Sequence, residues 1–216
     1  DGILITHEHA DHIQGHGVIA RKYEIPSYDT AGTIKAMKSC SSLGNVEESL
    51  YREVQEDRKL TIKDLTINPM HISHDAAQPV GYRISYGSRR VAVCTDLGVY
   101  NDYTVECLKG MDALLLEANH DVNMLQVGPY PYYLKQRILG DRGHLSNENS
   151  GRLLGRILHD GLCTILLGHL SKENNLPELA YESVRLEINL GDNPYQAKDF
   201  DIRVARRSDL TPAVVL

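Results

Sequence analysis

The segment that decides how this sequence is interpreted is Ile3-Leu4-Ile5-Thr6-His7-Glu8-His9-Ala10-Asp11-His12. A short apolar run, typical of a buried strand, leads directly into three imidazoles and a carboxylate. Alternation along an extended turn would put the first two histidines on one side, with Asp11 and His12 near a second centre. Imidazole and carboxylate suit Zn, Mn or Fe, and two such ions about 3.5–4 Å apart can share a hydroxide nucleophile. The segment therefore predicts a site for two divalent metal ions.

Three later apolar runs also end in residues that can bind a metal or move a proton. Residues 91–94, 113–116 and 164–167 are aliphatic or β-branched and are bounded by polar residues, which is typical of buried strands. The polar residues that follow these runs are Asp96, Glu117, His120 and His169. Because polar residues just past strand ends mark the functional edge of a layered α/β sheet, we expect these side chains to share one site.

The rest of the chain alternates between helical and strand-like patterns. Helical periodicity covers residues 30–38, 102–108, 146–159 and 177–187, and strand-like alternation covers residues 59–72, 81–86 and 200–205. The helix from residue 146 is the clearest, because Ser146 can cap it and apolar residues recur along one face. Residues 127–133, rich in Pro and Tyr, are predicted to form a long loop. An α/β fold is therefore expected.

Composition and charge limit the class of protein. The chain has 216 residues, 42% of them hydrophobic, which fits a single domain over residues 1–216. Its four cysteines form no C-x-x-C pair, and no apolar stretch approaches the roughly 20 residues of a membrane span, so we expect a soluble, cytoplasmic protein. The net charge of −6 argues against a broad basic face for nucleic acid but allows a local one. The chain opens on Asp1-Gly2 directly before a strand, and we expect that an N-terminal stretch is missing.

The H-x-H-x-D-H pattern of residues 7–12 resembles the signature of the metallo-β-lactamase superfamily, and the later candidate ligands follow that family's order. The resemblance implies a four-layer αββα sandwich, here without its N-terminal strands. It implies that the first metal is bound by His7, His9 and His74, the second by Asp11, His12 and His169, and that Asp96 lies between them. His71, close before His74, is the alternative third histidine of the first metal.

Two further resemblances narrow the reaction. Gly143-His144-Leu145-Ser146 resembles a segment of tRNase Z-like enzymes in which an extra histidine assists phosphodiester cleavage. Across the whole chain, three segments are similar to the YycJ/WalJ group of bacterial DNA exonucleases linked to DNA repair: residues 116–121, 143–147 and 169–175. The resemblance implies metal-dependent hydrolysis of DNA. In that reaction Asp11 would orient the attacking water and accept its proton, and His144 would stabilise charge or protonate the leaving group.

Other side chains are predicted to orient the site or hold the substrate. Glu117 is expected to hydrogen-bond His144 and fix its ring, and His120 to lie near the path of the substrate. Ser146 opens a helix whose backbone amides can cradle a phosphate. Aromatic and basic residues interleave along residues 130–142, a pattern that can stack bases and pair with phosphates. Residues 130–142 are expected to form a loop that holds the substrate strand, and the predicted substrate contacts in it are Tyr132, Lys135, Arg137 and Arg142.

Two alternatives stay open at this point. One is a hydrolase of a small thioester or amide, similar to glyoxalase II or a lactamase, because one fold serves many reactions. Such an enzyme would not need the helix start at His144. The other is a non-catalytic metal-binding module, which the missing N-terminal elements would favour. The sequence does not distinguish DNA from RNA, identify the metal or determine the oligomeric state.

Overall fold

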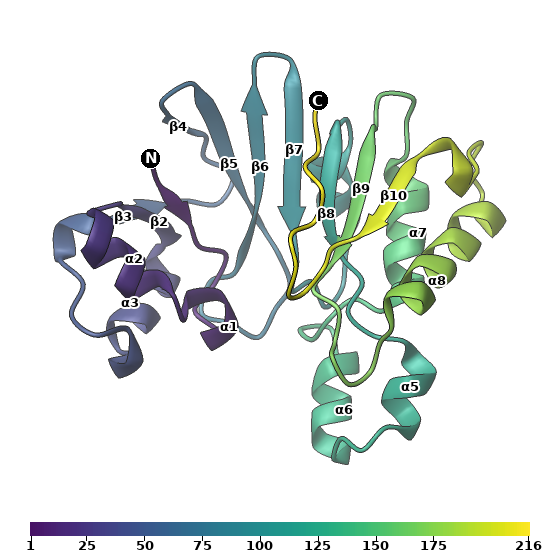
Figure 1. The fold of residues 1–216 in the computed structure, drawn as a ribbon, viewed down its shortest axis with the longest axis horizontal. Coiled ribbons are helices and arrows are strands. Elements are labelled where there is room, and N and C mark those ends of the chain that lie inside the picture. The colour runs from purple at the N-terminus through teal and green to yellow at the C-terminus, as the bar shows by residue number, and fades with distance from the viewer. The chain divides into compact units, whose positions relative to one another are not determined.

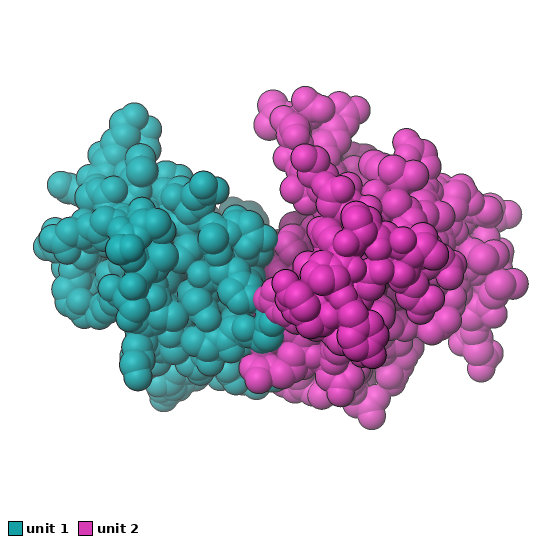
Figure 2. All heavy atoms as spheres, turned by 90° about the horizontal axis from the view of Figure 1, so that it is seen from below, with its two compact units in different colours: residues 1–71, 75–86 teal, residues 72–74, 87–216 magenta.

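The computed structural model describes all 216 residues, and they form two compact units. Unit 1 comprises residues 1–71 and 75–86, and unit 2 comprises residues 72–74 and 87–216 (Figure 2). Both units combine strands with helices (Figure 1), which confirms the predicted α/β class. All four cysteines are free thiols. None of the helices combines the length and the apolar character that crossing a membrane requires.

Unit 1 contains two groups of strands, and short helices connect the strands of the first group. The parallel group, in spatial order, is β1 (Ile3–Leu4), β2 (Ser27–Thr30) and β3 (Tyr51–Val54). The antiparallel group is β4 (Leu60–Ile62), β5 (Leu65–His71) and β6 (Val80–Tyr86). The helices are α1 (Ala10–Ile13), α2 (His16–Tyr23) and α3 (Ala31–Lys38), with 3-10 turns η1 (Ser41–Leu43) and η2 (Glu48–Leu50). The predicted helix over residues 30–38 is confirmed, and the predicted strand over residues 59–72 is a hairpin.

The end of β1 is held from both faces of the parallel strands. Ile5 belongs to a buried cluster with Ile13 and Met37, whereas Leu4 packs against a second cluster that contains Tyr82. Burying each such aliphatic side chain stabilises the fold by about 1.5–3 kcal/mol. The Tyr82 hydroxyl also donates a hydrogen bond of 2.7 Å to the Ile5 carbonyl oxygen. These contacts fix the backbone immediately before the histidine segment.

Unit 2 is built on four parallel strands. In spatial order they are β7 (Arg89–Cys94), β8 (Ala113–Glu117), β9 (Thr164–Gly168) and β10 (Asp201–Val204). The helices are α4 (Asp102–Leu108), α5 (Val122–Val127), α6 (Tyr132–Leu139), α7 (Asn147–Ile157) and α8 (Pro177–Leu190), with the 3-10 turn η3 (Ala197–Asp199). The predicted strands and the three predicted helices of this unit are confirmed, α8 extending three residues beyond its predicted end.

Helices cover one face of the strands of unit 2 and bury the apolar side chains on that face. Leu116 on β8 and Leu167 on β9 are fully buried, as are Leu153 and Leu154 on α7. Figure 1 shows α7 and α8 side by side along these strands. Parallel pairing brings the carboxyl ends of β7, β8 and β9 to one edge, where the residues that follow each strand meet.

The predicted long loop over residues 127–133 is wrong. α5 ends at Val127, and α6 begins at Tyr132, so only residues 128–131 connect them. Pro131 occupies the position before the first helical residue, and Gly140 follows the last one. Pro near a helix start and Gly after its end are ordinary helix signals, and the high local content of tyrosine concealed them.

Candidate metal centre

In unit 1, the histidine segment folds back on itself. The predicted extended turn holds as far as His9, the extended N-cap residue of α1, but from Ala10 onward the segment is helical. The helical turn brings the ring of His12 to 4.1 Å from that of His7, and the ring of His9 lies 4.6 Å from His7. His7 is fully buried, while the side chain of Asp11 is 67% exposed. The segment therefore brings the imidazoles of His7, His9 and His12 together and leaves the carboxylate of Asp11 accessible to solvent.

Two neighbours of these histidines were not predicted. The Thr6 hydroxyl oxygen lies 3.1 Å from Nδ1 of both His7 and His12, so it orients both rings. Glu8 stands between His7 and His9 in the sequence, but its Oε1 accepts a hydrogen bond of 2.7 Å from the backbone N–H of Ala77. That bond ties the segment to the chain before β6. Thr6 has a structural role that only the fold reveals.

In unit 2, the carboxylate of Glu117 organises the strand ends. Glu117 is fully buried. Its Oε1 accepts hydrogen bonds from Nδ1 of His144 (2.9 Å) and of His169 (2.8 Å). Its Oε2 accepts from the backbone N–H groups of Leu97 (2.8 Å) and Leu145 (3.0 Å). The bond to His144 matches the expectation from sequence, whereas the bond to His169 was not predicted.

These hydrogen bonds control ionisation. Burial by itself raises the pKa of Glu117, but the bonds from His144 and His169 outweigh it, so the pKa lies below its usual range. Burial lowers the pKa of His144, and the adjacent Glu117 reverses this, so the pKa lies above its ordinary value. At neutral pH the cluster therefore contains an ionised carboxylate that accepts from two imidazoles.

Asp96 is the point on which the imidazoles of unit 2 converge. Its Oδ1 lies 3.6 Å from Nε2 of His169, 3.7 Å from Nε2 of His74 and 3.8 Å from Nδ1 of His144. His74 is 1% exposed and its Nδ1 donates to the carbonyl oxygen of Gly143 (3.0 Å). In both His74 and His169, Nδ1 donates to the protein, so Nε2 presents the lone pair. This donor set fits a divalent metal ion.

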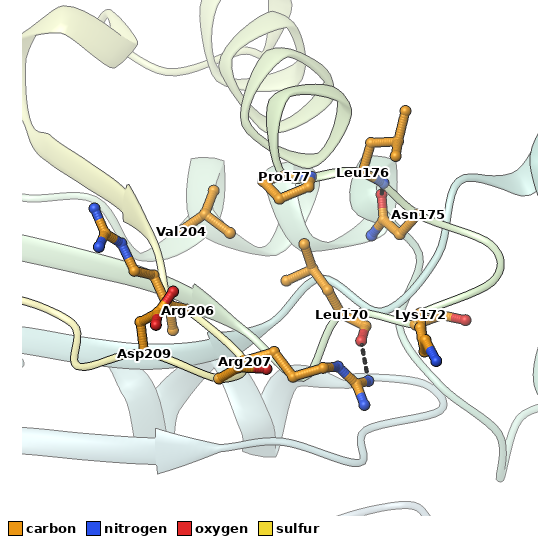
Figure 3. A pocket seen from close by; sticks show the side chains of 12 residues that line it. Leu170, Lys172, Asn175, Leu176, Pro177, Val204, Arg206, Arg207 and Asp209 are labelled. Atoms are coloured by element: carbon orange, nitrogen blue, oxygen red, sulfur yellow. Dashed lines mark hydrogen bonds between the residues drawn. The ribbon is translucent and has the colours of Figure 1, made fainter.

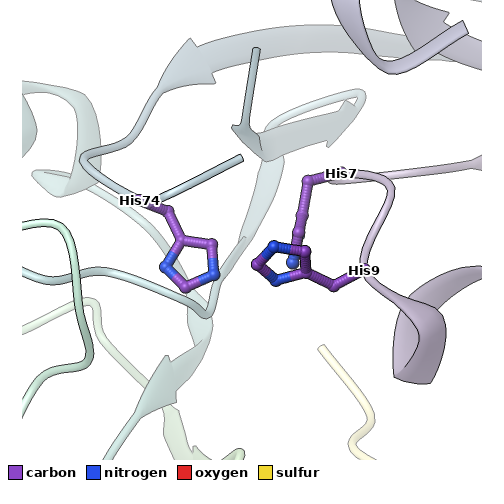
Figure 4. A group of neighbouring side chains, drawn as sticks. All are labelled: His7, His9 and His74. Atoms are coloured by element: carbon purple, nitrogen blue, oxygen red, sulfur yellow. The ribbon is translucent and has the colours of Figure 1, made fainter. Parts of the chain in front are cut away.

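The two candidates for the third histidine of the first metal, His71 and His74, lie in different surroundings. The side chain of His71 is 56% exposed and lies 3.7 Å from Glu56, at the end of β5. His74 is buried in the loop beyond that strand, beside Asp96. Figure 4 shows where the imidazoles originate, with His7 and His9 on the segment after β1 and His74 on the loop after β5.

Two of the candidate ligands hold strained backbone. Asp96 and His169 have φ values of 59° and 56°, the left-handed region that non-glycine residues rarely adopt. Such conformations cost of order 1–3 kcal/mol and persist only where surrounding contacts enforce them. Here the amide of Leu97 is bonded to Glu117, and Asn119 Nδ2 donates to the His169 carbonyl oxygen (2.9 Å). Backbone strain at both Asp96 and His169, which follow neighbouring parts of the sheet and belong to one cluster, indicates a functional constraint.

The predicted substrate contacts fall on α6 and the turn after it, not on a loop. Tyr132 is 76% exposed, and Arg137 is also exposed. Lys135 Nζ donates to the Gln126 carbonyl oxygen (2.7 Å), linking α6 to α5. Arg142 Nε donates to the His74 carbonyl oxygen (3.1 Å), so it braces the loop that carries this histidine.

Two predictions at the start of α7 and the end of β8 are corrected. Ser146 is buried, and its hydroxyl accepts from the Asn149 amide as the N-cap of α7. The next amide, that of Asn147, is bonded to the carbonyl oxygen of His120, so two of the first three amides of α7 already have protein acceptors and do not face a phosphate. His120 is 1% exposed and therefore does not line a substrate path. Both residues connect strand and helix beneath the cluster.

Comparisons with known proteins place the chain in a family. The β-lactamase superfamily domain matches residues 1–161. The chain therefore belongs to the metallo-β-lactamase superfamily, which confirms the family expected from the histidine segment. Over 192 residues it is 44% identical to the exodeoxyribonuclease WalJ of Streptococcus pneumoniae serotype 2 (strain D39), a match that covers 89% of this chain and 71% of WalJ. It is 40% identical over 183 residues to the exodeoxyribonuclease YycJ of Bacillus anthracis, covering 85% and 69% of the two chains.

A solved structure supports the same fold. The metallo-β-lactamase fold protein YhfI from Bacillus subtilis matches with a TM-score of 0.65 at 20% identity, over 95% of this chain and 74% of YhfI. The chain thus has an α/β fold of the metallo-β-lactamase type. Together with the clustered imidazoles and carboxylates, among them Asp96, Glu117, His144 and His169, this family membership identifies a protein that binds divalent metal.

Proposed function

We propose that this chain is a metal-dependent DNA exonuclease. Its similarity to two exodeoxyribonucleases supports the reaction class. One structural observation carries the proposal further. His144 lies outside the predicted ligand set, yet Glu117 holds it together with His169, and it lies 3.8 Å from Asp96. A metal-binding module has no need of this extra imidazole, whereas phosphodiester cleavage needs a group that stabilises charge on the phosphate or protonates the leaving oxygen.

The proposed centre holds two ions, Zn, Mn or Fe. We assign the ligands by their order along the chain: His7, His9 and His74 to the first ion, Asp11, His12 and His169 to the second, and Asp96 to both. The buried imidazole and carboxylate donors of each unit support this assignment. When bound, the ions would supply a hydroxide nucleophile at neutral pH and polarise the phosphate oxygens.

The residues of the chain then have separate roles. Asp11, with its exposed carboxylate, orients the attacking water and accepts its proton. Glu117 engages Nδ1 of His144 and so leaves Nε2 of that ring to meet the phosphate or the leaving oxygen. Tyr132 and Arg137 are exposed on α6, where they would stack a base and contact a phosphate. We further propose that the protein acts in the cytoplasm, in DNA repair.

The test begins with metal quantification on the purified chain and continues with a Mn²⁺-supplemented nuclease assay on 5′-phosphorylated duplex and single-stranded DNA. We expect two metals per chain, cleavage that a chelator abolishes and Mn²⁺ restores, and no cleavage by Asp11→Ala. Asp64→Ala, which removes an exposed carboxylate in the turn between β4 and β5, is the matched control and should cleave normally.

Three outcomes would contradict the proposal. Undiminished cleavage by Asp11→Ala would refute the role of this carboxylate. Turnover of S-lactoylglutathione without action on DNA would identify a thioesterase instead. Failure to retain two metals, with no turnover of either substrate, would identify a non-catalytic module.

A further inference from the structure

A cavity of about 590 Å³ opens beside the loop that follows His169. Its walls come from three segments of unit 2: the residues after β9, the start of α8, and the residues after β10 (Figure 3). Leu170 and Ser171, the first two residues after His169, belong to the lining. The cavity therefore begins at the residue directly after His169, the proposed metal ligand that follows β9.

The charge of the cavity differs from that of the chain. Lys172, Arg206 and Arg207 line it together with a single carboxylate, that of Asp209. The whole chain has a net charge of −6, so a local excess of cations stands out from an acidic background. Such a local positive field attracts an anionic ligand.

The cations of the cavity are held in different ways. Arg207 Nη2 donates to the Leu170 carbonyl oxygen (2.8 Å) and so fastens the segment after β10 to the loop after His169 (Figure 3). Lys172 and Arg206 are exposed, and they lie on opposite segments of the lining. Arg207 thus has a structural role, and the other two cations are available to a ligand.

One wall of the cavity is apolar. Leu170, Leu176, Pro177 and Val204 contribute it, and Leu176 is 54% exposed, although large apolar side chains are usually buried. A ligand that matches this lining has a flat uncharged part as well as an anionic part. A nucleotide has both, in its base and its phosphate.

We propose that this cavity binds a nucleotide of the DNA strand next to the scissile phosphate. Two phosphates of the strand would lie against Lys172 and Arg206, one at each cation, and the base between them against the apolar wall. The inference rests on the proposed function, because an exonuclease must hold the strand beside the cut. It adds a binding site that begins at Leu170, the residue directly after His169.

The test measures binding without catalysis. Chelator-treated chain is titrated against a labelled oligothymidylate of about eight nucleotides, within the range of single-strand site sizes, and fluorescence anisotropy is followed at several salt concentrations. The variant is Lys172→Ala with Arg206→Ala, which leaves the Arg207 bond intact. The control, Arg185→Ala with Lys198→Ala, removes the same charge outside the cavity.

The expected loss follows from counterion release. Each phosphate contact on a single strand contributes about 0.7 to the slope of log affinity against log salt, so two lost contacts lower the slope by about 1.4. At about 0.1 M salt this corresponds to roughly 25-fold weaker binding. The control should bind within about twofold of the unsubstituted chain, since surface charges away from the strand release few counterions.

Binding by the cavity variant at unchanged affinity and salt slope would overturn the inference. Equal affinity for an abasic oligonucleotide would overturn the assignment of the base to the apolar wall. The two proposals also fail separately. If the chain cleaves no DNA but the cavity variant binds the strand more weakly, the binding site is supported and the nuclease activity is not. If the chain cleaves DNA normally and the cavity variant binds the strand unchanged, the activity is supported and the binding site is not.

Discussion

Replacing Glu117 by Gln tests the reasoning about the cluster most directly. The carboxylate accepts four hydrogen bonds, two on each oxygen, and is fully buried. An amide of the same shape has one oxygen that accepts and one nitrogen that donates. Whichever way the amide is turned, two of the four N–H donors that now meet the carboxylate would face another donor.

The size of the effect follows from that conflict. Each buried donor left without an acceptor costs about 1–3 kcal/mol, so two cost about 2–6 kcal/mol. In a chain of this length, 1 kcal/mol shifts the unfolding midpoint by roughly 2–4 °C, which predicts a midpoint roughly 5–20 °C lower. This loss of stability is avoided only if the imidazoles of His144 and His169 carry their protons on Nε2 and accept a hydrogen bond from the amide at Nδ1. That change would remove the Nε2 lone pair of His169 that the metal needs.

The assay therefore has two readouts. Urea and thermal unfolding of chelator-treated chain measure stability, and Zn²⁺ titration against a chromophoric chelator measures metal affinity. We expect Glu117→Gln to lose stability or, if the imidazole protons shift, to lose metal affinity by at least the roughly 10–100-fold typical of lost ligand support. Glu182→Gln, the same change at an exposed ion pair on α8, should stay within about 0.5 kcal/mol. A Glu117→Gln chain with unchanged stability and unchanged metal affinity would refute the reasoning.

Two further predictions concern the buried groups around the site. Burial raises the pKa of Asp29 in unit 1 to about 7, against a bond from Ser27 that lowers it, so the folded chain keeps a proton that the unfolded chain releases near pH 4. Stability should then fall as pH rises, by about 3 kcal/mol between pH 5 and 8, and urea unfolding of Asp29→Asn should lack this slope; parallel slopes in both chains would contradict the assignment. Asn119→Ala should lower stability by about 1–3 kcal/mol and metal affinity roughly 10–100-fold, because it removes the donor that holds the His169 carbonyl oxygen. Unchanged thermal unfolding and unchanged Zn²⁺ titration would show that the left-handed backbone of His169 does not depend on this bond.

Much of the fold could be predicted because the signals are local. The strands β7, β8 and β9 and the helices α3, α4 and α7 follow from short apolar runs, a capping residue and a 3.6-residue period, all of which lie within each segment. The failures are also local in origin. Helix α6 was predicted as a loop because tyrosines and a proline, which are common in loops, surround its first residue, whereas its helix-forming residues follow later.

The candidate site divides between sequence and structure in the same way. The chemistry of the ligands is a property of residue type, so the histidines and aspartates, and their position after strand ends, are evident from the chain alone. The sequence indicated the bond between Glu117 and His144, but it did not show the other contacts of these residues. Glu117 bonds His169 from 52 positions away, and Arg142 bonds the carbonyl oxygen of His74 from 68 positions away. The spacing of residues along the chain does not predict such long-range contacts.

By itself, then, the sequence determined the class of fold, the metal-binding residue types and the family. The tertiary structure alone decided that Glu117 holds His169 as well as His144, that Ser146 is a buried cap, and that Lys172 and Arg206 line one cavity. The physical reason is that periodicity and side-chain chemistry act within a few residues. Burial and hydrogen bonding in a layered α/β fold, by contrast, are set where the carboxyl ends of separate strands come together.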